Sequence, residues 1–202
     1  MSDERSKRSF PLSSQERGPG GEFVYSVIGL MSGTSLDGLD IAFCRFRKEP
    51  SKWQYELVLA ETVPYSGEWL ERLASLVNAP GQKLTEADTE YGFLLGRLVS
   101  DFIRRNKIRP DFIASHGHTV FHRPEKHFTL QIGKGSAIAA VTGLPVVCDF
   151  RSLDVNLGGQ GAPLVPVGDR LLFPEFDYCL NLGGFANISF EEKGKRIAFD
   201  IC

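Results

Sequence analysis

The sequence predicts an α/β fold, a mixed sheet with helices, and three observations support that prediction. Two apolar runs at residues 27–30 and 39–43 flank a segment rich in glycine and hydroxyl residues, which is typical of two strands joined by a tight turn. After this opening, strand-like apolar runs alternate with segments of helical period. The 202 residues are 42% hydrophobic and 24% charged, an ordinary balance for a globular protein with a core.

Each expected element follows from its hydrophobic period and its flanking turn residues. The long helix is expected to begin at Thr85, because Thr85 and Asp88 have the spacing of a capping box with a shorter acid. Pro166 is expected to interrupt a later helix, and Pro174 to end it. In chain order we predict strands at 27–30, 39–43 and 55–60, helices at 67–78 and 85–106, strands at 112–114 and 128–132, a helix at 136–142, a strand at 146–148, a helix at 164–173, and strands at 178–180, 186–190 and 196–201.

Three regions are expected along the chain. Residues 1–25 are predicted to be a disordered extension, and residues 26–175 a first lobe. Residues 176–202 are predicted to begin a second lobe, because a strand, a glycine turn and a strand repeat the opening pattern there. This second lobe is expected to be truncated, since so few strands do not bury both faces of a sheet.

Composition argues against several classes of partner. A net charge of −2 offers no electrostatic footprint for nucleic acid or an anionic membrane, so neither is expected. No apolar segment has the length of a signal peptide or a membrane helix. The four cysteines are far apart and form no CxxC pair, which favours buried free thiols in a reducing compartment. We therefore predict a cytoplasmic protein.

The turn at residues 32–39 is the first candidate site. Glycines at 33 and 38 let successive backbone N–H groups face one concavity beside two hydroxyls, which suits phosphate. Asp37 and Asp40 would repel a bare phosphate but can hold an accompanying Mg²⁺. An ordinary hairpin turn is the alternative, since turns commonly use Gly, Ser and Asp. The sequence has no GxxxxGK[ST] loop, and a phosphate-binding hairpin indicates, by fold analogy, an ATPase of the actin and hexokinase type.

A second candidate region carries histidine and arginine. All four histidines fall between residues 116 and 127, and an HxH after a strand opens some zinc hydrolase sites. The alternative is that these histidines are hydrogen-bonded in a loop beside the sheet. Further along, Arg151 follows a strand and either binds a substrate carboxylate or pairs with Asp154. The glycine-rich loop at 158–161 is predicted to be a hinge or a substrate loop.

Five strings together resemble the anhydro-N-acetylmuramic acid kinase family, the sugar kinases of cell-wall recycling. They occur in the family's order and extend the resemblance from residue 27 to the end of the chain. The strings are GLMSGTSLDGLD at 29–40, SHGHTVFH at 115–122, HFTLQIG at 127–133, CDFRSLDVNLGGQGAPLVP at 148–166 and LNLGGFANIS at 180–189.

The resemblance implies a fold and an activity. The fold would be the actin-like ATPase (ribonuclease H-like) fold, here the first lobe and the start of the second. The activity would use ATP, Mg²⁺ and water to open 1,6-anhydro-N-acetylmuramic acid and phosphorylate its O6, giving N-acetylmuramic acid 6-phosphate and ADP. The alternative is a catalytically incomplete fragment, or a module of the same fold that binds a sugar or a partner without catalysis. A homodimer is also expected.

The resemblance also implies roles for individual residues. Asp200 would be the catalytic base that deprotonates water. Asp37 and Asp40 would hold Mg²⁺ through water, and Arg151 would meet the lactyl carboxylate of the sugar. His118 stands where relatives often have glutamine, and either side chain can hydrogen-bond a sugar. The implied nucleotide-binding residues are Ser32, Gly33, Thr34, Ser35, Leu36, Asp37, Gly38, Leu39, Gly183, Gly184 and Asn187, and the implied substrate-binding residues are His116, His118, Thr119, Arg151 and Gln160.

Overall fold

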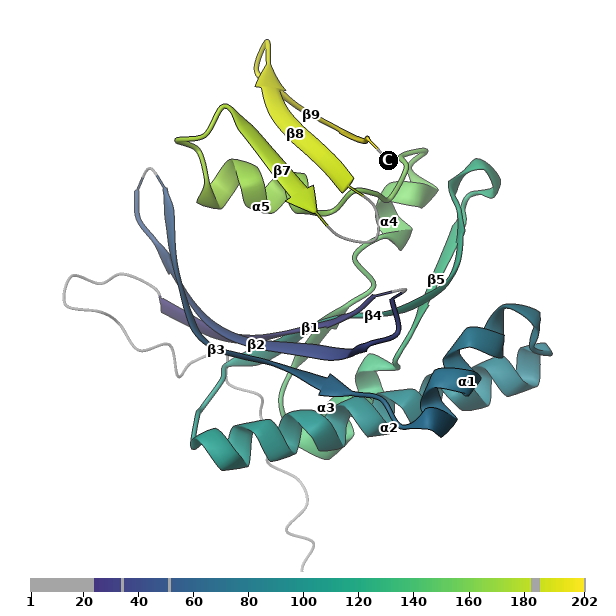
Figure 1. Cartoon of the computed structure of the whole chain (residues 1–202). Coiled ribbons are helices and arrows are strands. Elements are labelled where there is room, and N and C mark those ends of the chain that lie inside the picture. The colour runs from purple at the N-terminus through teal and green to yellow at the C-terminus, as the bar shows by residue number, and fades with distance from the viewer. Residues whose placement is uncertain (1–23, 34, 51, 183–185, 202) are drawn as a thin grey trace, which may run out of the picture.

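The structure, a computed structural model, describes residues 24–33, 35–50, 52–182 and 186–201 (Figure 1). Its opening is an antiparallel meander. Strand β1 (Val24–Ser32) pairs with β2 (Gly38–Lys48), and β2 pairs with β3 (Trp53–Pro64). The prediction of two strands joined by a tight turn is therefore confirmed, and the third strand belongs to the same sheet as expected.

Three further strands complete a six-stranded mixed sheet. Strand β4 (Phe112–Arg123) lies parallel to β1, and its second half pairs antiparallel with β5 (Phe128–Ile132). The short strand β6 (Val146–Cys148) lies parallel to the first half of β4, on the side of β4 that is opposite β1. The carboxyl ends of β1, the first half of β4 and β6 therefore meet at one edge of the sheet, where α/β folds usually bind ligands.

Helices cover one face of this sheet. Helix α1 (Gly67–Ser75) and the 3₁₀ turn η1 (Leu76–Asn78) lead into α2 (Gly81–Asn106), which lies beneath the sheet with α3 (Gly135–Thr142) (Figure 1). One face of α2 enters the core because apolar residues recur at three- and four-residue spacing. The fully buried side chains of that face are Ala87, Tyr91, Leu95, Val99 and Phe102.

A smaller three-stranded sheet lies across the opposite face (Figure 1). Strands β7 (Tyr178–Leu182), β8 (Ala186–Glu192) and β9 (Lys195–Asp200) are antiparallel. In chain order, α4 (Ser152–Asn156) and α5 (Val165–Leu172) come after the last strand of the first sheet and before the first strand of the second. None of the helices in the described ranges is long and apolar enough to cross a membrane.

Two details of the predicted helices are wrong. Helix α2 begins at Gly81 with Pro80 as its N-cap residue, so Thr85 lies inside the helix and donates to the Gly81 carbonyl at 2.9 Å. Asp88 forms no capping box and instead accepts from the Gly133 N–H at 2.8 Å. Pro166 does not interrupt α5, because it lies in the first turn, where a backbone N–H has no intrahelical partner.

The largest correction concerns β4. The sequence predicts a strand at 112–114 followed by a loop with the histidines, whereas β4 continues to Arg123 and holds His116, His118 and His122 within the strand. Gly117 and polar residues hide the apolar alternation here, and Gly117 has a positive φ of 72°. Helix α4 and a short 3₁₀ turn, η2 (Pro124–Lys126), are also missing from the predicted elements.

The cysteines of the described residues are free thiols as predicted, but they are not buried. Cys44, Cys148 and Cys179 are free thiols, but Cys148 is exposed and the other two are half-buried. Strand β1 already begins at Val24. The predicted division into lobes stays a prediction. Residues 1–23, Thr34, Gly183, Gly184 and Cys202 lie outside the described residues.

Candidate functional site

The turn between β1 and β2 is closed by local hydrogen bonds. Ser32 ends β1 and is buried, whereas Ser35 and Asp37 are exposed. The Leu36 N–H donates to the Gly33 carbonyl at 3.3 Å, and the Ser35 hydroxyl donates to Asp37 Oδ1 at 2.8 Å. Leu36 has a positive φ of 57°, which is uncommon for a leucine. The turn is therefore held by its own backbone and hydroxyls.

Two residues at the start of β2 fix where the turn ends. A Cβ at Gly38 would come within 2.5 Å of the Val63 carbonyl oxygen on β3, so only glycine fits this approach. Leu39 is 1% exposed and belongs to the hydrophobic core. Of the residues implied to bind nucleotide, Leu39 can therefore offer only its backbone.

The two carboxylates of the turn are compatible with Mg²⁺. Asp37 and Asp40 are both exposed. Asp37 accepts from Ser35, and Asp40 Oδ1 accepts from the Thr62 hydroxyl at 2.5 Å, which leaves further oxygens of each carboxylate for a hydrated cation. Two carboxylates suit this ion because Mg²⁺ usually keeps several of its waters.

The base of the turn is tied to the core by a buried chain of hydroxyls. The Tyr65 hydroxyl donates to Ser32 Oγ at 2.8 Å and lies 2.5 Å from the Tyr91 hydroxyl, so Tyr91 must donate to Tyr65. Ser32 Oγ lies 3.0 Å from His118 Nδ1, and the serine hydroxyl donates to this nitrogen when the imidazole carries its proton on Nε2. The order Tyr91, Tyr65, Ser32, His118 thus links α2, the end of β3, β1 and β4.

Burial sets the protonation of this hydroxyl chain. It raises the pKa of the Tyr65 and Tyr91 phenols, which therefore remain donors at neutral pH. Burial lowers the pKa of His118, and nearby His116 lowers it further, so His118 is neutral and can accept from Ser32. The sequence predicted Ser32 and His118 for separate sites, and the structure joins them.

His116 and Arg151 form a second cluster. Arg151 Nε donates to His116 Nε2 at 2.9 Å, which requires the tautomer with a proton on Nδ1, and that Nδ1 donates to the Gly117 carbonyl at 2.9 Å. Burial lowers the pKa of His116, and the charge of Arg151 lowers it further. His116 is therefore neutral and both ring nitrogens are occupied.

Arg151 also organises the glycine-rich loop. Its Nη1 donates to the Gly161 carbonyl at 2.6 Å, and Asp154 Oδ2 accepts from the Gly161 N–H at 2.7 Å. In the described part of the chain Arg151 and Asp154 form no ion pair, so that alternative is wrong, and each binds Gly161 instead. Gln160, next to this anchored residue, is exposed.

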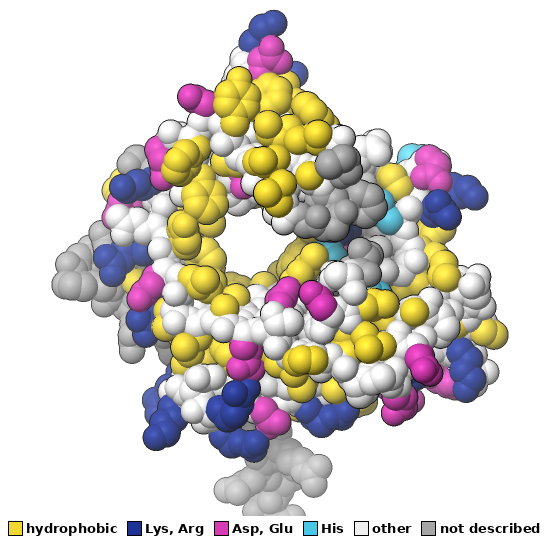
Figure 2. Space-filling view, in the orientation of Figure 1, with side chains coloured by type: hydrophobic (Ala, Val, Ile, Leu, Met, Phe, Trp, Pro, Cys, Tyr) yellow, Lys and Arg dark blue, Asp and Glu magenta, His cyan; other side chains and the backbone are white. Residues whose placement is uncertain are grey.

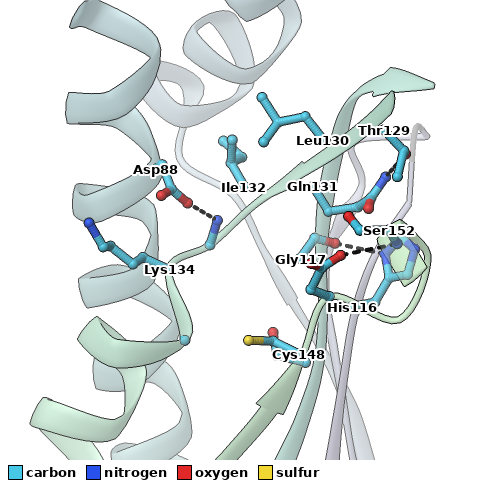
Figure 3. Close-up of a pocket in the computed structure, with 14 residues that line it drawn as sticks. Asp88, His116, Gly117, Thr129, Leu130, Gln131, Ile132, Lys134, Cys148 and Ser152 are labelled. Carbon is cyan, nitrogen blue, oxygen red and sulfur yellow. Dashed lines mark hydrogen bonds between the residues drawn. The ribbon is translucent and has the colours of Figure 1, made fainter. Parts of the chain in front are cut away.

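A pocket of about 190 Å³ lies beside His116 (Figure 3). It is at the carboxyl ends of the first half of β4 and of β6, between β5 and the start of α3. Ser115 is one of the lining residues, and its buried hydroxyl has no hydrogen-bond partner within the described residues. The lining residues are Asp88, Ser115, His116, Gly117, Thr129, Leu130, Gln131, Ile132, Gly133, Lys134, Gly135, Cys148, Asp149 and Ser152.

The remaining site residues lie apart from this pocket or are engaged elsewhere. Thr119 accepts from the Gln131 side chain at 3.3 Å. Asp200 is exposed at the end of β9 and is the register partner of Asn187, which is buried. Within the described residues no hydrogen bond or ion pair joins Asp200 to the β1–β2 turn, so its predicted role as the base stays a prediction.

Metal binding by the histidines finds no support here. Across the described ranges no three His, Cys, Asp or Glu side chains gather closely enough to hold a metal ion. His122 Nδ1 instead bonds to the Thr129 hydroxyl at 3.1 Å on the neighbouring strand. The zinc alternative therefore lacks a ligand set in this part of the molecule.

Comparison with known proteins identifies relatives. The family model described as anhydro-N-acetylmuramic acid kinase matches residues 25–202. The kinase of that name from Pasteurella multocida is 40% identical over 179 residues, covering 83% of this chain and 46% of the relative. The one from Pseudomonas putida is 37% identical, covering 84% and 48%. This chain thus spans about half the length of these curated relatives.

Among solved structures, the PPX-GPPA enzyme of Aquifex aeolicus is similar to 88% of this chain and 52% of its own, with 12% identity and a TM-score of 0.35.

Proposed function

The chain belongs to the anhydro-N-acetylmuramic acid kinase family, and from this premise we propose that it forms the phosphate-binding and sugar-contacting part of such a kinase. The predicted α/β fold of the sugar-kinase type is confirmed by this membership together with the mixed sheet and its helices. The proposed reaction consumes ATP and water and converts 1,6-anhydro-N-acetylmuramic acid to N-acetylmuramic acid 6-phosphate and ADP, in peptidoglycan recycling.

The observation that carries this proposal is the hydroxyl chain beneath the β1–β2 turn. A turn that positions phosphates must not move when charge builds up during phosphoryl transfer. Ser32 is held from below by Tyr65 and His118, so the exposed turn is attached to the rigid core at its first residue. In the proposed function residues 32–39 contact the ATP phosphates through those donors of the turn that are not already bonded, as the Leu36 N–H and the Ser35 hydroxyl are.

Mg²⁺, when bound with ATP, would neutralise charge between the phosphates, and Asp37 and Asp40 would hold it through water. Arg151 would bind the lactyl carboxylate with its remaining N–H groups, because His116 and Gly161 use only the Nε hydrogen and one Nη1 hydrogen of its five. The bidentate pair that the sequence suggests is therefore kept as the proposed contact. His116, His118, Thr119 and Gln160 remain candidates for sugar contacts.

Asp200 is proposed as the base that takes a proton from water as the water attacks the anomeric carbon. The bond from that carbon to O6 breaks, and O6 then takes the γ-phosphoryl group with loss of ADP. Asn187 on β8, together with Gly183 and Gly184 earlier in the sequence, is proposed to contact the phosphates. A cytoplasmic location and a homodimer remain predictions.

A second candidate function is binding of the sugar without turnover. It is favoured by one observation, that the chain spans about half the length of its curated relatives. Binding alone would need the pocket and the His116–Arg151 cluster but not Asp200.

One experiment separates these functions. The 202-residue chain is incubated with Mg-ATP and 1,6-anhydro-N-acetylmuramic acid, and the 6-phosphorylated sugar is followed by mass spectrometry. Asp200→Asn is run beside it, with the exposed Asp177→Asn as the matched control. Product from the parent chain and the control but none from Asp200→Asn supports the kinase and its base. Equal product from all three removes Asp200 as the base, and no product from any supports binding without turnover.

A further inference from the structure

The second sheet has a polar face and an apolar face, and the two are covered unequally. On the polar side Ser189 of β8 donates to Asp169 of α5 at 2.5 Å and accepts from Arg196 of β9 at 2.9 Å. The side chains of Asp169 and Arg196 are only 15% and 9% exposed, and Ser189 is buried. Helix α5 therefore packs on the polar face of this sheet.

Large apolar side chains alternate with these polar ones and share the opposite face. The ring centroids of Tyr178 and Phe190 are 5.5 Å apart, and those of Phe190 and Phe199 are 6.3 Å apart, so aromatic contacts cross all three strands. Figure 2 shows hydrophobic side chains gathered over this region. We call the apolar face the five residues that are more than half exposed, namely Tyr178 (67%), Leu180 (57%), Leu182 (76%), Phe199 (51%) and Ile201 (54%).

The apolar face is large for a surface left to water. A large apolar or aromatic side chain has roughly 150–250 Å² of surface, so these exposed fractions add to about 500–600 Å². The largest apolar patch on a typical monomer is about 300–600 Å², and patches of that size often mark an interaction site. A sheet normally buries its apolar face against another layer, whereas α5 covers the polar face here.

A groove extends the apolar face around the edge of β7. It lies between α5 and β7 and has a volume of about 300 Å³. Tyr178 and Leu180 belong to the apolar face and also line the groove, so the two surfaces are continuous. Phe173 and Phe176 line it from the segment that follows α5. Its size and aromatic lining suit one large apolar side chain of a partner.

The comparison with relatives indicates what covers this surface. The match covers 46% of the Pasteurella multocida kinase and 48% of the Pseudomonas putida kinase, so more than half of each relative has no counterpart in the matched region. The family model matches residues 25–202, which include the whole second sheet. A sheet that longer relatives share, and that is apolar on one face, is expected to pack against a part that those relatives contain in addition.

We propose that the apolar face binds a polypeptide equivalent to the unmatched part of these kinases. That partner packs a layer of apolar side chains on the face and inserts one of them into the groove. The inference rests on family membership and on the exposed surface, and it needs no sugar, nucleotide or turnover, so it stands apart from the proposed function.

A second copy of this chain fits the apolar face less well. Two apolar faces pressed together would bury about 1,000–1,200 Å² in total, which is below the range of about 1,200–2,000 Å² for stable interfaces. The unmatched part of a relative is longer than the matched part, so it can cover the apolar face and the groove together.

Co-expression tests the proposal. The 202-residue chain carries an affinity tag, and the second polypeptide is the part of the Pasteurella multocida kinase that this chain does not match. We expect the two to co-purify as a complex with one copy of each, measured by analytical ultracentrifugation. Hydrogen exchange should slow in β7–β9 of the complex and stay unchanged in α1. Failure to co-purify, or a complex without slower exchange in β7–β9, would overturn the inference.

Leu180→Asp places a charge on the apolar face, and Val77→Asp on η1 is its control, because Val77 is also about half exposed. Both should leave the thermal midpoint of the 202-residue chain nearly unchanged, since neither side chain is buried. Recovery of the second polypeptide should fall at least tenfold with Leu180→Asp and stay constant with Val77→Asp. Leu182→Lys repeats the test if Leu180→Asp unfolds the chain. Equal recovery with the parent and with the variants of the apolar face contradicts the inference.

The same variant separates the two occupants of the face. We expect the oligomeric state of the 202-residue chain alone, measured by analytical ultracentrifugation, to be the same for the parent and for Leu180→Asp. A parent dimer that Leu180→Asp dissociates would assign the apolar face to a second copy and overturn the inference.

Discussion

The two sheets of this molecule differ in how much apolar surface they bury. The six-stranded sheet covers an apolar core shared with α2, in which Ile28, Leu95 and Ile138 are fully buried. The three-stranded sheet turns polar residues inward, since Asn187 and Ser189 are its buried positions. Its opposite face is apolar and open, and Figure 2 shows hydrophobic side chains gathered over it. The exposed residues of that face are Tyr178, Leu180, Leu182, Phe199 and Ile201.

Different interactions therefore hold the two regions. The first sheet is stabilised by burial of apolar surface, and the second by a polar cluster in which Ser189 donates to Asp169 at 2.5 Å and Arg196 donates to Ser189 at 2.9 Å. The β1–β2 turn and the pocket beside His116 both belong to the first sheet, which packs on the hydrophobic core. Asp200 lies on the sheet whose apolar face is open.

The largest difference between the regions should appear in core truncation. Leu95→Ala should lower the free energy of unfolding by about 3–4 kcal/mol, because it leaves a cavity under the first sheet. Leu180→Ala, on the open face of the second sheet, should change it by less than about 0.5 kcal/mol. Urea unfolding followed by circular dichroism measures both. Similar losses for the two variants would mean that the open face is covered in solution.

The second sheet should instead respond to loss of its polar cluster. Arg196→Gln leaves the largely buried Asp169 carboxylate without its cation, which we expect to cost about 2 kcal/mol, confined to β7–β9. Hydrogen exchange should quicken in β8 and β9 while α2 keeps its protection. Arg170→Gln, which removes a more exposed ion pair with Glu191, serves as the control. Equal exchange in both variants would remove the polar cluster as the source of stability.

The hydroxyl chain should have a smaller effect, located at the turn. Tyr65→Phe removes the donor to Ser32 and leaves Tyr91 without its acceptor, at an expected cost of about 1–2 kcal/mol. The affinity for Mg-ATP should fall with it, because the turn loses its attachment. Calorimetry and thermal unfolding measure the two effects, with the half-exposed Tyr55→Phe as the control. Unchanged stability and affinity in Tyr65→Phe would contradict this role of the hydroxyl chain.

The smallest effect should be a pH dependence from the buried histidines. Burial lowers the pKa of His116 and His118 below 6.5, so in the window beneath 6.5 the unfolded chain binds more protons than the folded one. Stability is therefore complete above 6.5 and falls on acidification, by at most about 1.4 kcal/mol per pH unit for each histidine. His118→Gln, which keeps an acceptor for Ser32, should flatten the decline of the thermal midpoint between pH 7 and 5. An unchanged slope would exclude His118 as a contributor.

Much of the fold was predictable from local pattern. The β1–β2 turn, the meander, the alternation with helices and the strands of the second sheet all follow from period and turn residues, which act over a few positions. The errors occur where a distant partner decides. Asp88 resembles a cap in sequence, but it lies across from Gly133, whose N–H it accepts in the folded chain. The histidine segment resembles a loop, but pairing with β1 and β5 makes His116, His118 and His122 part of β4.

The candidate site shows the same division. Ser32, His116, His118 and Arg151 were predicted from motif strings, yet their bonding partners were not. Tyr65 and Tyr91 carry no motif, and Tyr91 appears in the sequence only as one apolar position of a helix. Ser115 is an ordinary serine in the sequence, and only the fold shows that its hydroxyl is buried with no partner among the residues that the structure describes.

The sequence by itself determined most of the strands and helices, the position of the β1–β2 turn and the family to which the chain belongs, because these depend on residue order over short spans. Only the tertiary structure decided that Ser32 is held by Tyr65 and His118, that Arg151 binds His116 and Gly161 in preference to Asp154, and that Ser115 faces a pocket. Hydrogen bonds between residues far apart in the chain, such as 32 with 118, form only when packing brings strands together and excludes water from the atoms that remain.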